Sequence, residues 1–313
     1  MNTNVTIGSL QLKNPVLVAS GTFGYGDDCT ELVDAGLLGG IVTKSLSLKP
    51  RDGNPPPRIV ETASGMLNSI GLANIGVAKF IDDKLPFLQK LPTSIIVNIA
   101  ASTVDEYCTV LTMLEGHEGI DAYEINVSCP NVKEGGLNFG TNCDMTAEIT
   151  RRLRKLTRKP LIIKLTPNVT HIAEFARAVE GEGADGVTVI NTVIGMAIDV
   201  RGRKPKLSTV TGGLSGPAIK PIALAKVYEV AQAVKIPVIG SGGIATSDDA
   251  IEFLLAGATA VQVGTANFVN PATGVSIIEG LREYGEREKI SDVCELVGAL
   301  QVSRKLSIID SWI

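Results

Sequence analysis

Residues 236–266 read IPVIGSGGIATSDDAIEFLLAGATAVQVGTA, and this stretch decides the fold. A short run rich in Val and Ile ends in the glycines of residues 240–243, and a second such run ends in Gly264 and Thr265. Between the two runs, apolar residues recur every three or four positions after a Ser-Asp pair suited to capping a helix. Strand, helix and strand in this order predict two parallel strands joined by a crossover helix.

The same alternation extends over most of the chain. Helical patterns cover residues 103–116, 143–157, 171–183, 223–234 and 247–258. Short apolar runs, typical of strands buried on both faces, cover residues 15–21, 39–45, 94–100, 123–128, 161–166, 186–192, 236–243 and 260–266. We therefore expect an α/β fold, a (β/α)8 TIM barrel, formed as one domain by residues 1–313 because no interdomain linker is visible.

Three further segments complete the expected architecture. NVTIGSLQLKNPV (residues 4–16) reads as an N-terminal β-hairpin with Gly8 and Ser9 at its turn, covering the lower end of the barrel. Residues 46–76 and 193–222 are too long for bare connections, and loops of this length are usually functional. Both follow strands, so we expect them on the C-terminal face, where barrels build their active sites.

Composition excludes several classes of protein. The chain has 313 residues, a net charge of −4 and 20% charged residues, which argues against a nucleic-acid-binding surface. No apolar run reaches the ~18 residues of a membrane span, and the N-terminus lacks the features of a signal peptide. Five scattered cysteines, none in a CxxC pair, favour a reducing cytoplasm and argue against an iron–sulfur cluster or structural zinc in this chain.

Polar side chains interrupt the strands close to their C-terminal ends. They are Lys44, Asn98, Asn126, Lys164 and Asn191. An uncompensated buried polar group costs roughly 2–7 kcal/mol. Any one of these residues could be satisfied by its neighbours, but five that converge on one mouth favour a bound polar ligand. A flat heterocycle with amide-like groups would use such donors and acceptors.

Glycines after the last two strands indicate a phosphate. Residues 240–243 and 264–265 place glycines before predicted helices, and TGGLSGP (residues 211–217) adds a third group from a long loop. A phosphate-bearing cofactor is therefore expected. The stretch GSGGIA also matches the dinucleotide pattern GxGxxA, but no acidic residue follows at the end of the next strand, which excludes a Rossmann nicotinamide site.

One thiol stands apart from the other four. Cys129 lies in EINVSCPNVKEGG (residues 124–136), between Asn126 and Asn131 and directly after a predicted strand. The two histidines have neither ligand spacing nor a plausible Ser partner. Cys129 is therefore the best available acid–base group at the rim, while Cys29, Cys108, Cys143 and Cys294 are interpreted as small apolar residues.

Seven motifs in order give the sequence a resemblance to a known family over nearly its whole length. NSIGL, INVSCPNV, IIKLTPN, VINT, TGGLSGPAIKP, GSGGI and VGTA resemble the class 1 dihydroorotate dehydrogenases. NVKEGG after the cysteine, together with TGGLSGPAIKP, is similar to type B, the NAD-linked form. The resemblance implies an FMN-dependent oxidation of (S)-dihydroorotate to orotate in pyrimidine (UMP) biosynthesis.

The resemblance also implies roles for individual residues. Cys129 would remove the C5 proton while hydride passes from C6 to FMN N5, and Lys164 would stabilise charge on the reduced flavin. The residues implied to contact FMN are Ser20, Lys44, Ser45, Asn98, Asn126, Lys164, Ile190, Gly216, Gly242, Gly243, Gly264 and Thr265. Those implied to surround orotate are Lys44, Asn68, Ser69, Ile70, Gly71, Leu72, Asn126, Asn131, Asn191 and Thr192. No metal is expected.

Electrons must then leave the flavin, and this chain shows neither a cluster nor a nicotinamide site. The resemblance implies a partner subunit that carries FAD and an iron–sulfur (2Fe-2S) cluster and passes electrons to NAD+. It further implies a heterotetramer with two copies of each chain around a homodimer core of this one, located in the cytoplasm.

Four alternatives stay open on the residues alone. A type A enzyme would be a homodimer that reduces fumarate. A phosphate-binding barrel isomerase or lyase would share the glycines but not need the strand-end amides. A tRNA-modifying flavoprotein is disfavoured by the acidic balance and the lack of an RNA-binding domain. A non-catalytic binding module would leave Cys129 without a role.

Overall fold

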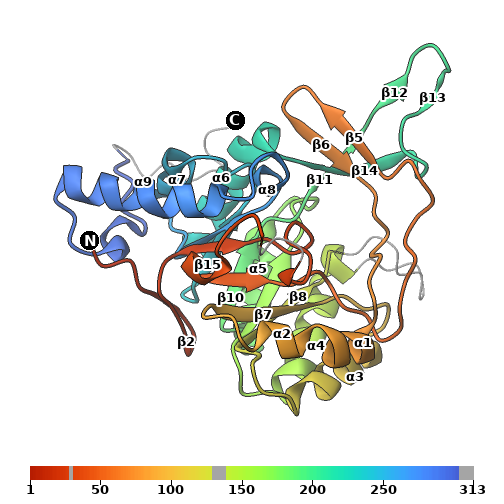
Figure 1. Ribbon diagram of the computed structural model, residues 1–313, viewed down its shortest axis with the longest axis horizontal. Coiled ribbons are helices and arrows are strands. Elements are labelled where there is room, and N and C mark those ends of the chain that lie inside the picture. The colour runs from red at the N-terminus through yellow and green to blue at the C-terminus, as the bar shows by residue number, and fades with distance from the viewer. Residues whose placement is uncertain (28–30, 129–138, 303–313) are drawn as a thin grey trace.

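A closed barrel of eight parallel strands forms the centre of the molecule (Figure 1). The structure is a computed structural model that describes residues 1–27, 31–128 and 139–302. Around the barrel, the strands follow one another in chain order, and the last pairs with the first. They are β3 (Val16–Val18), β4 (Gly40–Val42), β7 (Ser94–Ile99), β8 (Ala122–Asn126), β9 (Leu161–Leu165), β10 (Gly186–Val189), β15 (Val238–Ser241) and β16 (Ala260–Val263). The expected TIM barrel is therefore confirmed.

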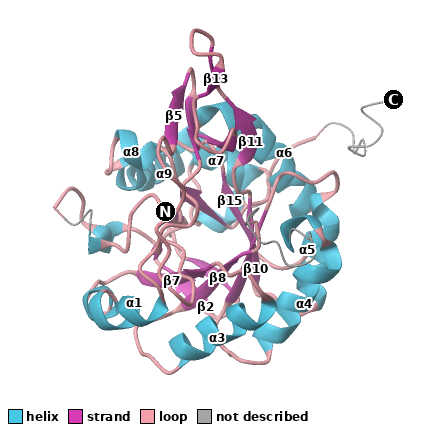
Figure 2. Cartoon of the chain, turned by 90° about the vertical axis from the view of Figure 1, so that its right-hand side faces the viewer, coloured by secondary structure: helices cyan, strands magenta, loops and turns pink. Residues whose placement is uncertain are grey.

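Helices surround the strands, as Figure 2 shows. They are α1 (Val77–Asp83), α2 (Leu85–Leu88), α3 (Val104–Glu115), α4 (Cys143–Arg154), α5 (Ile172–Gly181), α6 (Lys220–Ala231), α7 (Ser247–Leu255), α8 (Ala266–Val269) and α9 (Thr273–Glu288). Short 3-10 helices occupy Ala35–Leu37, Phe139–Thr141, Pro217–Ile219 and Val293–Leu296. Each of the five helical patterns in the sequence coincides with a helix. Within the described ranges, no helix has both the length and the apolar character that a membrane crossing requires.

The amphipathic pattern of the helices explains how they cover the barrel. In α3, Tyr107, Val110, Leu111 and Leu114 are fully buried, and they lie on one face because they are three or four residues apart. Thr103 begins the helix, since its side chain accepts a hydrogen bond from the backbone N–H of Glu106. Burying each such large apolar side chain contributes about 1.5–3 kcal/mol.

The N-terminal hairpin lies at the lower end of the barrel, as expected. It consists of β1 (Val5–Ile7) and β2 (Leu10–Leu12), with Gly8 in the turn at φ 58°. A Cβ atom at Gly8 would lie 2.7 Å from Cβ of Asp185, the residue that directly precedes β10. The turn therefore contacts the N-terminal end of the barrel, opposite the end where the polar residues gather.

The two long loops form a second sheet, which the sequence did not predict. The strands β5 (Ile59–Thr62), β6 (Gly65–Asn68), β11 (Val193–Met196) and β14 (Thr211–Ser215) pair antiparallel in the order β11-β14-β6-β5. Because β6 pairs with β14, the segment after β4 is joined to the segment after β10. This sheet covers the C-terminal side of the barrel.

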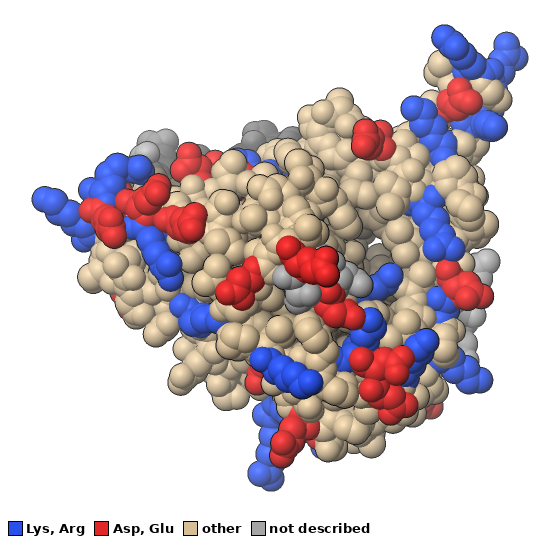
Figure 3. Space-filling view, viewed as in Figure 1, with Lys and Arg blue, Asp and Glu red and all other residues tan. Residues whose placement is uncertain are grey.

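A small hairpin projects from the second sheet. It consists of β12 (Ile198–Asp199) and β13 (Lys204–Pro205), and Figure 1 shows it standing clear of the barrel. Basic side chains gather at its tip in Figure 3, where Arg201, Arg203, Lys204 and Lys206 occur close together in the sequence. Apolar residues of the same hairpin are also exposed, including Val200, whose exposed fraction is 81%.

Candidate active site

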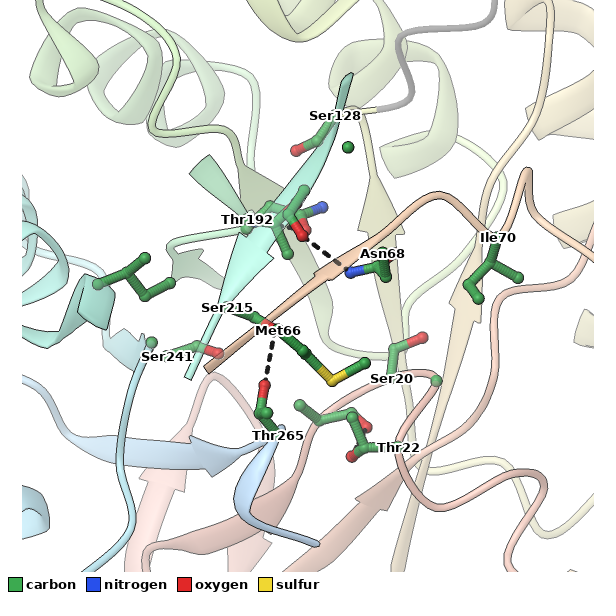
Figure 4. Close-up of a pocket in the computed structure, with 18 of the residues that line it drawn as sticks. Ser20, Thr22, Met66, Asn68, Ile70, Ser128, Thr192, Ser215, Ser241 and Thr265 are labelled. Carbon is green, nitrogen blue, oxygen red and sulfur yellow. Dashed lines mark hydrogen bonds between the residues drawn. The ribbon is translucent and has the colours of Figure 1, made fainter. Parts of the chain in front are cut away.

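A cavity of about 760 Å³ opens at the C-terminal ends of the barrel strands, beneath the second sheet. Its volume lies within the range of about 300–1,000 Å³ that is usual for small-molecule and cofactor sites. Residues from all eight barrel strands, or from the loops directly after them, line it together with residues of β6 and β14. Figure 4 shows side chains from the barrel and from the second sheet facing one another across this space.

The structure brings the expected flavin-binding residues together around this cavity. All of them line it, namely Ser20, Lys44, Ser45, Asn98, Asn126, Lys164, Ile190, Gly216, Gly242, Gly243, Gly264 and Thr265. They come from positions spread over 246 residues of sequence, from 20 to 265, so their convergence follows from closure of the barrel. What each of them binds stays a prediction.

The residues expected around the substrate line the same cavity wherever the structure describes them. These are Lys44, Asn68, Ser69, Ile70, Gly71, Leu72, Asn126, Asn191 and Thr192. Cys129 and Asn131 lie outside the described residues. Ser128, which directly precedes Cys129 in the chain, lines the cavity (Figure 4).

The amides at the strand ends are held by specific hydrogen bonds. Asn126 ends β8, and its side-chain oxygen accepts from Nδ2 of Asn191 at 3.2 Å and from the backbone N–H of Ser128 at 3.1 Å. The Asn191 side-chain oxygen accepts from the backbone N–H of Thr192 at 2.8 Å. These contacts fix two amide groups at the cavity wall, and no described residue accepts a hydrogen bond from Nδ2 of Asn126, which is therefore available to a ligand.

A buried polar network closes the bottom of the cavity. Glu124 in β8 is fully buried, and its carboxylate accepts from Asn98 Nδ2 at 2.7 Å and from Thr188 Oγ1 at 2.7 Å. Nε2 of Gln262 donates to the same carboxylate at 2.5 Å, and Oε1 of Gln262 accepts from Lys164 Nζ at 3.1 Å. Glu124, Thr188 and Gln262 were not predicted as site residues, although a Glu and a Gln inside apolar strands were visible signals.

One atom of this network lacks a partner and faces the ligand space. Asn98 is fully buried in β7, and its side-chain oxygen is among the few buried polar atoms of the described residues that have no hydrogen-bond partner. Such a group costs about 1–3 kcal/mol unless something binds to it. Since Asn98 lines the cavity, a ligand with an N–H group would satisfy it. A flavin ring, which carries both N–H and carbonyl groups, fits this donor and acceptor set.

Glycines at the other end of the cavity allow a close approach of the backbone. Gly243 has φ 78°, and a Cβ atom there would lie 2.8 Å from the carbonyl oxygen of Gly216. Thr265 stands beside this segment and donates to Oγ of Ser215 at 2.7 Å, which joins the end of β16 to the second sheet. This arrangement suits the phosphate of a cofactor.

The N-terminus of α7, the helix after β15, is less suited to binding a phosphate than the sequence suggests. The first turn of α7 forms a capping box, in which Thr246 and Asp249 satisfy each other's backbone N–H groups. Oδ2 of Asp249 also accepts from the backbone N–H of Ala245 at 2.9 Å. The backbone N–H groups at the N-terminus of α7 are therefore bound by residues of its own first turn, whereas α8 begins directly after Gly264 and Thr265.

The second sheet holds the outer wall of the cavity in place. Asn54 donates to the backbone oxygen of Ser69 at 3.1 Å and to its hydroxyl at 2.9 Å. Asn68 Nδ2 donates to the carbonyl of Gly213 at 3.3 Å, and Asn168 donates to the carbonyl of Thr192 at 3.1 Å. Asn54 and Asn168 line the cavity and were not predicted as site residues.

Metal-ligating clusters and further thiols are absent from the cavity in the described part of the chain. No cluster of three or more metal-ligating side chains is found there. The thiols of Cys108, Cys143 and Cys294 do not line the cavity, and burial raises the pKa of each, which disfavours the reactive thiolate. Cys29 lies outside the described residues.

Comparison with known proteins identifies the family. A family model described as dihydroorotate dehydrogenase matches residues 2–284. The chain belongs to the dihydroorotate dehydrogenase family. Among the curated members of this family, a protein of Alkaliphilus oremlandii is 56% identical over 299 residues, which cover 96% of this chain and 99% of that protein. A second, of Trichlorobacter lovleyi, is 55% identical over 298 residues and covers 95% of this chain and 98% of the relative.

Both dihydroorotate dehydrogenase relatives carry the name "Dihydroorotate dehydrogenase B (NAD(+)), catalytic subunit". The fold of the family is also found in a solved structure, that of DHODH from Eimeria tenella in complex with ferulenol. It superposes with a TM-score of 0.78, covers 95% of this chain and 88% of the other, and has 23% sequence identity. At that identity the likeness supports the barrel fold alone.

Proposed function

We propose that this chain is the FMN-binding catalytic subunit of an NAD+-linked dihydroorotate dehydrogenase, which oxidises (S)-dihydroorotate to orotate in pyrimidine biosynthesis. Residues 1–313 would form a single FMN-binding domain. Membership of the family and more than 50% identity to relatives named as catalytic subunits support the proposal. The single observation that carries it is the polar floor of the cavity, where Asn98 has an unpaired side-chain oxygen and where Asn98 and Lys164 both contact Oε1 of Glu124.

The cavity offers separate positions for the parts of FMN. Asn98, Asn126 and Lys164 would face the ring, while Gly243, Gly264 and their neighbours would surround the phosphate. When bound, FMN supplies the acceptor for the hydride that leaves C6 of dihydroorotate. The buried Lys164 ammonium would balance negative charge on the ring, the role a preorganised cation fills best in a site shielded from water.

The substrate would be held by amides and one lysine. Orotate is a flat ring with two carbonyl groups and a carboxylate, and Asn68, Asn126 and Asn191 offer both donors and acceptors. Lys44 lines the same cavity, and no hydrogen-bond or ion-pair partner for its ammonium is found among the described residues. It is therefore available to the substrate carboxylate.

Cys129 is proposed as the base. The reaction removes a hydride from C6 and a proton from C5, which leaves the C5=C6 double bond of orotate. The thiolate of Cys129 would take the C5 proton, and Ser128 at the cavity wall supports a location near the substrate. A free cysteine has a pKa of about 8.5, so a thiolate fraction exists near neutral pH.

A second protein would carry the electrons to NAD+. We propose a partner subunit with FAD and a 2Fe-2S cluster, in a heterotetramer of two copies of each chain built on a homodimer of this one. The relatives' designation as catalytic subunits supports a partner. Exposed apolar residues of β11, Ile194 (65%) and Met196 (48%), and of the projecting hairpin, Ile198 (53%) and Val200 (81%), support a contact surface between chains. The mass of the purified chain in solution, alone and with the partner, tests this assembly.

An anaerobic titration tests the reaction itself. Dihydroorotate is added to the purified chain while the visible absorption of the flavin is followed, and bleaching is the expected result. A yellow protein that does not bleach would contradict the substrate assignment, and a chain that binds no flavin would contradict the cofactor. Turnover of the lone chain with fumarate would instead favour a type A enzyme.

A further inference from the structure

Glu124 is a buried carboxylate that lies behind the cavity-lining residues Asn98 and Lys164, and the proposed reaction has no use for it. It lies in the middle of β8, it is fully buried, and it does not line the cavity. Its side chain points into the barrel and contacts residues of four other strands, namely Asn98 (β7), Lys164 (β9), Thr188 (β10) and Gln262 (β16). All the hydrogen bonds among these residues run through it or through Gln262.

The partners of Glu124 match an ionised carboxylate. Three groups donate hydrogen bonds to it, and the Lys164 ammonium lies 3.8 Å from its Oε1. Burying such a pair costs desolvation energy, and apolar residues of similar size in its place are often neutral or stabilising. Stability alone therefore gives no reason to keep a charge at this position.

The carboxylate determines which way its neighbours point. A carboxylate only accepts hydrogen bonds, so Asn98 must turn its NH₂ group toward Glu124 and its oxygen toward the cavity. For the same reason Gln262 donates to Glu124 and presents its oxygen to Lys164. The Lys164 ammonium is thereby held at the cavity floor, and since Gln262 is its one hydrogen-bond acceptor among the described residues, its remaining protons are available to a ligand.

We propose that Glu124 is a positioning residue that sets the orientation of Asn98 and Lys164 toward the flavin and, through its negative charge, lowers the reduction potential of the bound flavin. The inference rests on the proposed function, because it requires FMN in this cavity. The direction of this change in reduction potential follows from Coulomb's law. Reduction adds negative charge to the ring, Lys164 favours that charge, and the nearby carboxylate partly cancels the effect.

The test measures the equilibrium between oxidised and reduced flavin in variants of the full chain loaded with FMN. Dithionite supplies the two electrons, and a reference dye reports the ambient potential. In Glu124→Gln, the ratio of reduced to oxidised flavin at a fixed potential is expected to rise at least tenfold, which is about 30 mV for a two-electron couple. By thermodynamic linkage, reduced FMN then binds tenfold more tightly relative to oxidised FMN than in wild type.

Two further variants separate the charge from a merely structural role. Glu124→Asp keeps the charge, and its ratio of reduced to oxidised flavin is expected to stay within about threefold of the wild-type value. Glu115→Gln is the matched control, because Glu115 also accepts side-chain hydrogen bonds, from Tyr123 at 2.8 Å and Thr157 at 2.9 Å, but neither of these partners lines the cavity. It is expected to leave the ratio unchanged.

Each outcome is decisive. Equal shifts in Glu124→Gln and Glu124→Asp, or no shift in either, would overturn the role of the charge. Should Glu124→Gln not fold, Glu124→Met replaces it as a neutral variant without an amide donor facing Lys164. If neither neutral variant folds while Glu124→Asp does, Glu124 is structural only and the inference fails. A wild-type chain that takes up no FMN would instead overturn the proposed function.

Discussion

Lys164 and Glu124 lie on neighbouring barrel strands, with Nζ of Lys164 3.8 Å from Oε1 of Glu124 and with Gln262 bridging the two. The side chain of Glu124 is fully buried and that of Lys164 is 8% exposed, so solvent screens the pair very little. One charge faces the cavity and the other faces the interior of the barrel. The pair thus connects the ligand-binding surface to the core of the fold.

This relationship predicts strong coupling in stability. Lys164→Met and Glu124→Gln each leave a buried partner without its counterpart, and each is expected to lower the free energy of unfolding by about 3–5 kcal/mol. The double variant should lose less than the sum of the two, with a coupling energy of about 1–3 kcal/mol. Urea unfolding of the four flavin-free chains measures this cycle. Additive losses would show that the two side chains do not interact.

A second prediction concerns the glycine at the expected phosphate end. Gly243→Ala forces a side chain into a left-handed conformation and places its Cβ 2.8 Å from the Gly216 carbonyl. We expect a loss of about 1–2 kcal/mol from the backbone conformation alone, and at least tenfold weaker binding of FMN. Fluorescence titration with FMN and thermal unfolding measure the two effects.

Gly116→Ala is the control for this prediction. Gly116 ends α3 with φ −76°, and no atom lies within 4 Å of a Cβ built there. This variant should bind FMN as tightly as wild type. Unchanged FMN affinity in Gly243→Ala would remove the glycine segment from the phosphate site.

The barrel could be predicted from the sequence because its strands are encoded locally. Each is a short Val- and Ile-rich run buried on both faces, and each of the five helical patterns begins close to the first residue of the corresponding helix. The long helix α9 was missed, since Gly274, Gly280 and Gly285 lower its helix propensity by about 1 kcal/mol each. Tertiary packing explains these glycines, because a Cβ at Gly280 would lie 2.5 Å from that of Ser247.

The second sheet and the polar floor could not be predicted in the same way. The strand TGGLS of β14 has little β-propensity, and it is defined by pairing with β6, almost 150 residues earlier. Glu124 occurs between two apolar residues, a pattern that also fits a strand with one face in water. Only closure of the barrel places it opposite Gln262, 138 positions away. The strand-end amides could be predicted because each interrupts an apolar run close to its C-terminal end, where barrel strands border the cavity.

Stability toward acid depends on Asp249, the third residue of α7, whose side chain completes the capping box with Thr246. Burial alone would raise the pKa of Asp249, but hydrogen bonds from Lys220, Ala245 and Thr246 together lower it. A lowered pKa means that the contribution of Asp249 is present above its unfolded value of about 3.9 and is lost as the pH falls through the folded value.

Asp249→Asn keeps an acceptor oxygen but loses the charge that pairs with Lys220, so it should lower the free energy of unfolding at pH 7 by about 0.2–1 kcal/mol. The difference between variant and wild type should shrink below about pH 4. Denaturant unfolding between pH 3 and pH 7 measures it, with Asp248→Asn in the same turn as the control. A difference that persists undiminished at low pH would mean that the charge of Asp249 is not what stabilises the turn.

The proposed base gives a prediction with a pH signature. Cys129→Ala should retain FMN but lose turnover by about a hundredfold or more, because no other thiol borders the cavity among the described residues. Cys129→Ser should turn over slowly, with a rate that keeps rising at high pH because a hydroxyl is a weaker base than a thiolate. Cys108→Ser is the matched control, since Cys108 lies on α3 outside the cavity, and its rate should equal that of wild type. Steady-state rates between pH 6 and pH 10 measure all three variants. Full turnover in Cys129→Ala, or a flat pH response in Cys129→Ser, would mean that a group other than Cys129 removes the C5 proton.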